Sequence, residues 1–162
     1  MGNCRNESIW TMIGVVQRVV KEASGFTSEN RKGGYFCLFD IILKCPVIIS
    51  MIGEVPAEKA GKYHRLSIEK AQRTFDHSEH KSSYESRNEK EEKYGGAIRA
   101  RRYIFSFSGL KKEEEDEAAM LVVAELLKEI DSDEAELIAV RNMNQFYPKL
   151  LEKFSSLLKL YR

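Results

Sequence analysis

The chain has 162 residues, of which 43% are hydrophobic and 31% are charged, and this balance fits one soluble globular domain with its own core. The 26 basic and 25 acidic residues give a formal net charge of +1, which excludes the basic excess of general nucleic-acid binders. No apolar run is long enough to cross a bilayer, and the three cysteines, at positions 4, 37 and 45, follow neither a disulfide nor a zinc spacing. We therefore expect a cytoplasmic protein with reduced thiols that contacts neither nucleic acid nor a membrane.

The first third of the sequence predicts a helix followed by two strands. Residues 8–24 place apolar side chains at three- and four-residue spacing, which indicates an amphipathic helix, and Ser8 is suited to cap it. A polar loop over 27–34 leads to the segments 35–43 and 47–52. These two segments are rich in aromatic and β-branched residues, so they are predicted to form a strand hairpin.

The middle of the chain predicts a loop, a helix and a long polar segment. Residues 54–62 contain proline and glycine and are expected to form a loop. A helix is predicted over 66–75 from its apolar spacing. Residues 76–93 are charged and serine-rich, which is the composition of a surface loop or of a lid.

A second hairpin and three helices are predicted in the remainder. The hairpin covers 97–107, and the helix over 112–130 has an acidic start and a basic end, as the helix dipole favours. A capping box predicts another helix over 131–140, and Pro148 suits the first position of a last helix. The apolar stripe of that last helix either packs on the core or forms a subunit contact. It comprises Leu150, Leu151, Phe154, Leu157, Leu158 and Tyr161.

Five local motifs occur in an order that resembles a known family. They are Glu69-Lys70-Ala71 with Phe75, Ser82-Ser83-Tyr84, Gly95-Gly96-Ala97-Ile98, Ser106-Phe107-Ser108-Gly109-Leu110 and Glu115-Asp116-Glu117. The chain resembles the GlcG-like proteins, also called the haem-degrading or haem-binding-protein-like family, which includes the C-terminal domain of PduO. The resemblance covers roughly residues 8–130, so the predicted helices beyond that point lie outside it.

The resemblance implies an α+β fold, namely a profilin-like α/β/α sandwich with a central antiparallel sheet. The chain would then be one domain over 1–162, with a core over about 8–130 and a C-terminal helical extension over 131–162. The family also implies homo-oligomers and, for some members, binding of haem, a corrinoid or another small cofactor. Two departures are visible: Ala97 leads to Ile98 where the family commonly has a proline, and Arg101-Arg102 replaces the glycine of the hairpin turn.

Two glycine turns flank the second hairpin and are predicted to open towards one shared ligand cleft. Gly95 and Gly96 can take backbone angles that other residues avoid, and Gly109 can do the same before the helix that follows. The free N–H groups of that helix start could hold an anionic group. Because the acidic residues 113–117 crowd the same helix end, self-capping is the alternative, and each turn can equally be purely structural.

Polar side chains beside these turns complete the predicted ligand site. Lys70 and Arg73 lie three residues apart on one predicted helix, where they either bridge to acidic neighbours or contact a carboxylate or phosphate of a ligand. Ser83 and Ser108 stand beside the glycine turns and are included in the site.

His77 and His80 are the candidate metal ligands. If their segment is helical, both imidazoles lie on one face and could share a metal, and either one could ligate haem iron. A solvated polar loop is the alternative, since two histidines alone make a poor metal site.

No motif in the sequence specifies a reaction. A nucleophile elbow, a P-loop and a dinucleotide glycine motif are all missing from it. The prediction is a small-molecule binding protein for a tetrapyrrole or another anionic cofactor. The alternatives are an enzyme that acts on a bound cofactor or small acid, and a structural protein that assembles through its last helix without any ligand.

Overall fold

The computed structural model describes residues 3–26 and 31–159, and for residues 3–8 it describes the backbone alone. The elements in chain order are α1 (Asn3–Ser24), β1 (Gly33–Asp40), β2 (Cys45–Gly53), α2 (Ala57–Asp76), η1 (Ser83–Ser86), η2 (Glu89–Glu91), β3 (Ala97–Arg99), β4 (Tyr103–Ser108), α3 (Glu113–Leu126), α4 (Ser132–Arg141) and α5 (Phe146–Lys159). The two η elements are short 3₁₀ turns.

The four strands form one antiparallel sheet in the order β2-β1-β4-β3. Because side chains alternate along a strand, β1 directs Phe36 and Leu38 to one face and Cys37 and Phe39 to the other. Both sets are buried, so the sheet needs a helical cover on each side.

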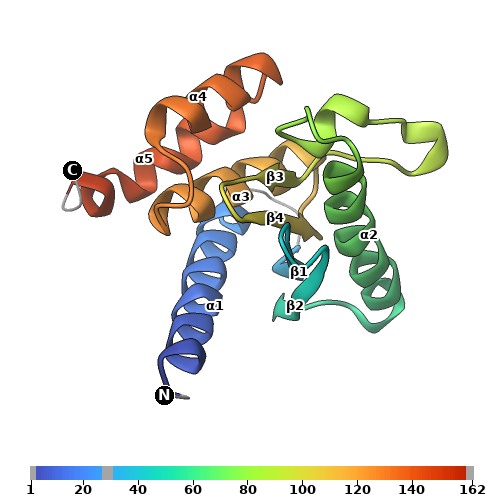
Figure 1. Ribbon diagram of the computed structural model, residues 1–162, viewed down its shortest axis with the longest axis horizontal. Helices are drawn as coiled ribbons and strands as arrows, with labels where there is room; N and C mark the ends of the chain where they lie inside the picture. Colours follow the sequence, from blue (N-terminus) through green and yellow to red (C-terminus); the bar gives the residue numbers. More distant parts are fainter. Residues whose placement is uncertain (1–2, 27–30, 160–162) are drawn as a thin grey trace.

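Helices cover both faces of the sheet. Helix α2 packs on one face against β1 and β4, while α1 and α3 lie on the other (Figure 1). Helices α4 and α5 pack on the outer side of α3. The predicted α+β sandwich with a central antiparallel sheet and extra C-terminal helices is therefore confirmed.

The apolar stripe of α5 packs on the protein's own core. Tyr147, Leu150, Phe154 and Leu158 are buried, and α5 contacts α3 along this side. Since α3 lies between the sheet and α5, every residue from Glu115 to Glu125 is buried. The stripe is thus used inside the subunit, although its last predicted member, Tyr161, lies outside the described residues.

The boundaries of α1, α3 and α5 differ from the prediction, and α5 begins at Phe146, so Pro148 is not its first residue. Helix α1 begins at Asn3, so Ser8 lies inside it and does not cap it. Helix α3 ends at Leu126, two residues before Lys128 adopts a positive φ of 58°. The side-chain pattern of a helix often continues past its last residue, so the pattern does not mark the helix ends sharply.

The predicted loop over 54–62 is wrong, because α2 starts at Ala57, directly after Pro56. A proline is compatible with a helix start, where its missing N–H has no helical partner to lose. Gly61 then lies inside the helix with open space around its Cα. A helical glycine costs about 1 kcal/mol relative to alanine, which a long helix tolerates.

The polar segment over 76–93 is packed against the domain and does not form a detached surface loop. Ser82 and Ser83 are buried. Ser82 bridges to Ile98, and Arg99 N–H donates to the Lys81 carbonyl at 2.9 Å, so the segment covers the outer edge of β3. The Ser82 hydroxyl donates to Glu117, a partner far along the chain that composition does not reveal.

Two further expectations concern the thiols and the membrane. Cys37 is buried, and this burial raises the pKa of its thiol to about 12, whereas Cys45 is exposed. The side chain of Cys4 is outside the described set. In the described part of the chain, every helix is too short or too polar to pass through a bilayer.

Asp40 ties the two hairpins together at one end of the sheet. Its carboxylate accepts the N–H groups of Ile42 and Leu43 at 2.9 and 3.0 Å, and Arg102 from the second hairpin donates to it at 3.0 Å. The backbone N–H of Leu43, followed by the contact with Arg102, holds the pKa of Asp40 below its ordinary value of 3.8. Arg102, which the sequence places in the turn of the second hairpin, thus has a structural partner.

The carboxylate of Asp40 gives a stability contribution that depends on pH. A lowered pKa means that the contribution is present above the unfolded-state value and is lost as the pH falls through the folded-state value. The Asp40→Asn variant is expected to be less stable than the wild type near neutral pH. The gap should shrink once the pH drops below 3.8, as followed by urea unfolding at a series of pH values. A gap independent of pH would show that the charge is unimportant.

The burial of Phe154 makes α5 part of the cooperative core. The Phe154→Ala variant is expected to lose about 3–5 kcal/mol of unfolding free energy, since it leaves a cavity at a residue that is 1% exposed. Leu137→Ala, at an exposed position on α4, should change it by no more than about 0.5 kcal/mol. Urea unfolding measures both, and equal values for the two variants would mean that α5 folds separately.

Candidate functional site

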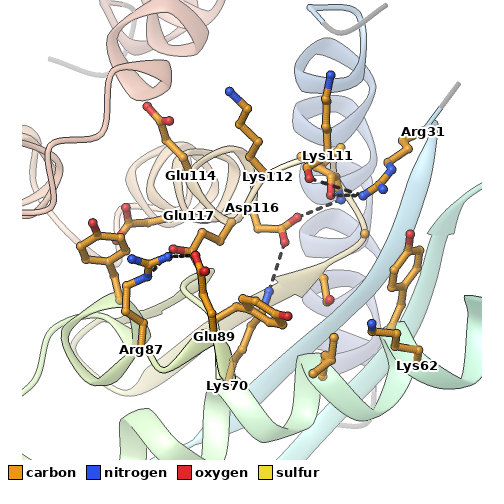
Figure 2. Close-up of a pocket in the computed structure, with 18 of the residues that line it drawn as sticks. Arg31, Lys62, Lys70, Arg87, Glu89, Lys111, Lys112, Glu114, Asp116 and Glu117 are labelled. Carbon is orange, nitrogen blue, oxygen red and sulfur yellow. Dashed lines mark hydrogen bonds and ion pairs between the residues drawn. The ribbon is translucent and has the colours of Figure 1, made fainter. Parts of the chain in front are cut away.

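One cleft of about 700 Å³ opens beside the start of α3. Its walls are the N-terminal half of α2, the segment over 84–94 and the turn that leads from β4 into α3 (Figure 2). The residues that matter for its chemistry are Arg31, Lys59, Lys62, Tyr63, Leu66, Lys70, Tyr84, Arg87, Glu89, Tyr94, Ser108, Gly109, Lys111, Lys112, Glu113, Glu114, Asp116, Glu117, Asn142 and Met143.

One face of α2 forms a wall of the cleft. Lys59, Lys62, Tyr63, Leu66 and Lys70 line it, and their spacing of three and four residues places them on the same side of the helix. This face joins exposed cationic residues at the helix start to a buried lysine deeper in the fold. The sequence contains this spacing, but the loop predicted over 54–62 excluded Lys59 and Lys62 from the helix.

Lys70 forms a buried ion pair with Asp116 at the base of the cleft. Its Nζ lies 3.1 Å from Asp116 Oδ2 and 2.9 Å from the Phe107 carbonyl oxygen, and the two side chains are 2% and 6% exposed. Burial raises the pKa of Asp116 to about 6, and the nearby Lys70 opposes this rise. Of the two predicted roles, Lys70 has the structural one, because its charge is already matched by the protein.

Gly96 is a glycine because Lys70 passes beside it. Its φ is +125°, and an added Cβ would lie 2.8 Å from Lys70 Nζ and 2.9 Å from the Phe107 carbonyl oxygen. Gly95 packs against Tyr84, whose Cβ would lie 3.3 Å from an added Cβ. Neither glycine lines the cleft, so both lie outside the candidate site, and their contact with a ligand stays a prediction.

Gly109 and Ser108 do line the cleft, although the backbone explains the glycine. Gly109 has a φ of +153°. A Cβ added to it would lie only 2.4 Å from the Gly33 carbonyl oxygen and 2.4 Å from Gly34 Cα. The glycine therefore permits close contact between the β4 end and the start of β1. Ser108 is 4% exposed and continues the same tight backbone contact.

The N-terminus of α3 is occupied by its own acidic side chains. Glu115 accepts the N–H of Lys111 at 3.1 Å, and Asp116 accepts the N–H of Leu110 at 3.0 Å. These N–H groups belong to the turn just before α3, and Glu115 also accepts the N–H of the N-cap residue Lys112 at 3.4 Å, so the carboxylates occupy this end of the helix. The self-capping alternative from the sequence therefore describes this helix start.

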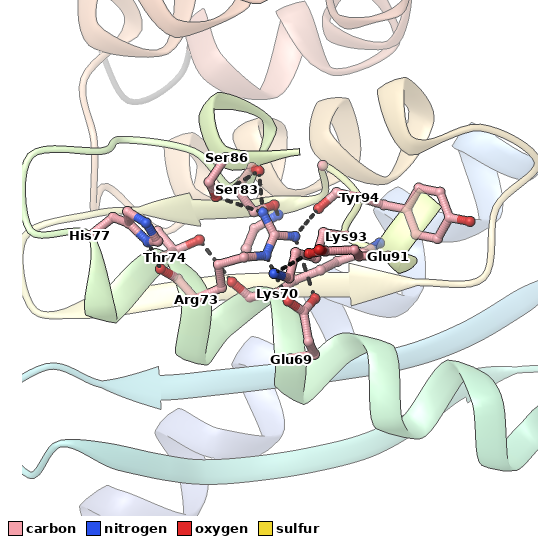
Figure 3. Close-up of polar contacts among 12 residues, drawn as sticks. Glu69, Lys70, Arg73, Thr74, His77, Ser83, Ser86, Glu91, Lys93 and Tyr94 are labelled. Carbon is pink, nitrogen blue, oxygen red and sulfur yellow. Dashed lines mark hydrogen bonds and ion pairs between the residues drawn. The ribbon is translucent and has the colours of Figure 1, made fainter. Parts of the chain in front are cut away.

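Arg73 and Ser83 hold the polar segment on α2 and do not reach the cleft (Figure 3). The Arg73 guanidinium donates to Glu69 Oε1 at 2.6 Å and to the carbonyl oxygens of Ser83 and Tyr94 at 2.7 and 2.6 Å. The Ser83 hydroxyl accepts the N–H of Ala97 at 3.0 Å. Both residues therefore support the cleft wall from behind.

His77 and His80 lie next to one another but away from the cleft. Their rings are stacked, with centroids 4.7 Å apart, and His77 Nδ1 lies 2.8 Å from the Arg73 carbonyl oxygen. They follow the C-terminal end of α2, whereas the cleft runs along its N-terminal half. Among the described residues, no group of three or more His, Cys, Asp or Glu side chains could hold a metal ion.

Glu117 is a buried carboxylate in the cleft wall. The sequence showed it as part of the motif Glu115-Asp116-Glu117 and did not predict it to line the ligand site. It accepts the Ser82 hydroxyl at 2.6 Å, Asn144 Nδ2 at 2.8 Å, and Asn142 Nδ2. Desolvation raises its pKa, which the three neutral donors partly offset. The group joins α3, the polar segment and the α4–α5 connection into one wall.

The charges around the mouth of the cleft are unevenly matched. Glu113 pairs with Arg87 at 2.6 Å, and the Glu114 carboxylate accepts the N–H of Gln145 at 2.6 Å. By contrast, within the described residues neither Lys59 nor Lys112 has a carboxylate at ion-pair distance. The acidic side chains are engaged inside the protein, and two lysines remain available to a ligand.

Comparisons with protein-family models, curated proteins and solved structures found no match to this chain. The resemblance to GlcG-like proteins therefore remains a prediction that rests on the local motifs.

Gly96 and Gly61 form a matched pair that tests the glycine argument. Gly96→Ala is expected to lower the unfolding free energy by roughly 2–4 kcal/mol, because the methyl group meets Lys70 and Phe107 at a strained φ. Gly61→Ala should raise it by about 1 kcal/mol, since nothing lies within 4 Å and the residue is helical. Thermal or urea unfolding measures both changes. A harmless Gly96→Ala would mean that Lys70 does not occupy the place described here.

Proposed function

We propose that the protein binds an anionic small molecule with a flat or apolar body in the cleft beside α3. The observation that carries this proposal is the combination of tyrosine walls with two unpaired lysines at the mouth of one cleft. The cleft volume of about 700 Å³ falls in the range of small-molecule sites.

The aromatic side chains give the cleft a surface for an apolar body. Tyr63 lies on α2, and Tyr84 and Tyr94 come from the polar segment on the other wall. Tyrosine offers a flat apolar ring together with a polar hydroxyl, which suits contact with a planar ligand. Leu66 adds apolar surface near the base.

The lysines supply the preference for negative charge. Lys59 and Lys112 stand on different elements, α2 and the turn before α3, so an anionic group between them would meet positive charge from two sides. Lys62 is already paired with Glu92 at 3.1 Å and contributes less. Lys112 is exposed and Lys59 is half-buried, so their attraction for an anion should weaken as salt is added.

A tetrapyrrole fits this description in its flat body and acidic side chains, but the cleft does not favour a histidine-ligated haem. The cleft-lining residues include no histidine or cysteine, and Met143 with the tyrosines are the side chains there that could meet iron. His77 and His80 lie elsewhere. The proposal therefore depends on charge and stacking, and haem or a corrinoid stays one member of a wider ligand class.

The other two functions expected from the sequence have less support. An assembly protein that uses the stripe of α5 would need that stripe on the surface, and it is buried against α3. An enzyme would need a reacting group in the cleft. The buried carboxylates Asp116 and Glu117 are held by internal donors there.

Titration with protoporphyrin IX, followed by its absorbance and fluorescence, tests the proposal. We expect saturable binding that weakens with salt and is about tenfold weaker in the Lys59→Ala/Lys112→Ala double variant, because each exposed charge contributes up to about 1 kcal/mol. Lys149→Ala, at an exposed position on α5, is the matched control and should bind as the wild type does.

Two further results would separate this proposal from its alternatives. The His77→Ala/His80→Ala variant should bind haemin as tightly as the wild type, since neither residue lines the cleft. Absence of saturable binding, or binding that survives unchanged in the double lysine variant, would rule out the cleft described here.

A further inference from the structure

The two edge strands of the sheet differ in whether a further segment of the chain pairs with them. At the β3 edge, Ser82 bridges to Ile98 and Arg99 N–H donates to the Lys81 carbonyl, so the polar segment pairs with the strand. At the other edge, β2 pairs with β1 alone, and no described segment pairs with its outer side. The outer N–H and C=O groups of β2 are therefore open to another strand.

The features of β2 that disfavour such pairing, Pro46 and the register shift opposite Leu38 and Phe39, lie in the first part of the strand. The nine residues of Cys45–Gly53 include no charged side chain. Edge strands of soluble proteins usually carry lysine or another charge that blocks contact with a second strand. Here Val47, Ile49 and Met51 alternate on one face and are 43%, 41% and 53% exposed.

These three residues lie on the face of the sheet that α2 covers elsewhere. Ile49 pairs with Cys37, which belongs to the apolar cluster beneath α2. Helix α2 covers the β1 side of this layer more fully than the β2 side, where these three side chains stay about half exposed. The result is an apolar strip that runs alongside an unpaired strand edge.

We propose that β2 is the interface between two copies of this chain, which pair antiparallel and join their four-stranded sheets into one continuous sheet. Pairing centred on Ile49 places the two copies of this residue opposite each other. Val47 then faces Met51 of the partner subunit, and Met51 faces Val47 of the partner subunit. Every cross-strand pair on this face is apolar, and the arrangement has the two-fold symmetry of most homodimers.

The symmetry of the pattern favours a second copy over a foreign strand. An unrelated peptide would satisfy the same backbone groups but would need its own matching apolar residues. The strand contains its own match, because Val47 and Met51 stand two residues on either side of Ile49.

Neighbouring apolar side chains extend the contact beyond the strand. A strand edge of this length is about 30 Å long and about 10 Å deep, which gives roughly 300 Å². Stable interfaces bury about 800 Å² per subunit. Helix α1, which contacts β2, carries Ile9 and the 74% exposed Trp10, and the β1–β2 turn carries the exposed Ile42 and Leu43. The N-terminal half of α1 also projects beyond the sheet (Figure 1).

Sedimentation velocity of the full chain over a concentration series tests the interface. We expect a dimer, and we expect Ile49→Lys to raise its dissociation constant about 100-fold or more, because two like charges then face each other at the symmetry axis. Val140→Lys replaces an exposed apolar residue of α4 and is the control that should leave the dimer intact. Circular dichroism and thermal unfolding establish that both variants are folded.

Disulfide formation provides a second readout that does not depend on weakening the dimer. In a Cys4→Ser/Cys45→Ser background, Ile49→Cys should form an intersubunit disulfide on mild oxidation, since directly opposed Cβ atoms lie about 4.5–5.5 Å apart. Val140→Cys should not. A chain that is monomeric at about 100 µM, a dimer that survives Ile49→Lys, or cross-linking at position 140 in place of 49 would each overturn the proposal.

Discussion

Lys70 connects the two helical layers of the molecule through a single buried ammonium group. It starts on α2, on one side of the sheet, and its Nζ ends between the Phe107 carbonyl of β4 and the Asp116 carboxylate of α3. Burying a lysine and a carboxylate is expensive, and removing either partner of such a pair typically costs about 3–5 kcal/mol. The surrounding structure is built to keep the pair intact: Gly96 leaves room for it, and Leu110 N–H satisfies the second oxygen of Asp116.

Other basic residues also serve the architecture. Arg73 fixes the polar segment on α2 through the carbonyls of Ser83 and Tyr94. Arg99 donates to the carbonyls of Thr74, His77 and His80 beyond the end of α2, where a positive charge suits the helix dipole. Because these cations are consumed by the fold, Lys59 and Lys112 stand out as the ones that the cleft can offer to a ligand.

The proposed dimer and the proposed ligand site use separate parts of the molecule. None of the residues of β2, all of which are described, lines the cleft. Pairing of two β2 strands would therefore leave the walls formed by α2, the polar segment and the start of α3 within each subunit. Two copies would carry two independent clefts, one beside each α3.

Local patterns along the chain are enough to predict the helices and strands of this fold. Apolar spacing and helix-start residues located all five helices, and the aromatic and β-branched runs located both hairpins, because these signals arise between residues close along the chain. Local signals failed where two meanings coincide: Pro56 and Gly61 are typical of a loop, yet both lie at or inside the first turns of α2. Because of that error, Lys59, Lys62 and Tyr63 were not predicted to lie on one helix face beside the cleft.

The choice of which candidate residues share a site depends on contacts between distant parts of the chain. Ser108 and Gly109 line the cleft, and Lys70 lies at its bottom, paired inside the protein. The other predicted residues lie behind the cleft walls: Arg73, Ser83, Gly95 and Gly96. The reason is that each of these roles depends on partners distant in sequence, as when Asp116 and Phe107 determine what Lys70 can do. Spacing along the chain carries no record of such contacts, and they form only when the sheet brings α2 and α3 together.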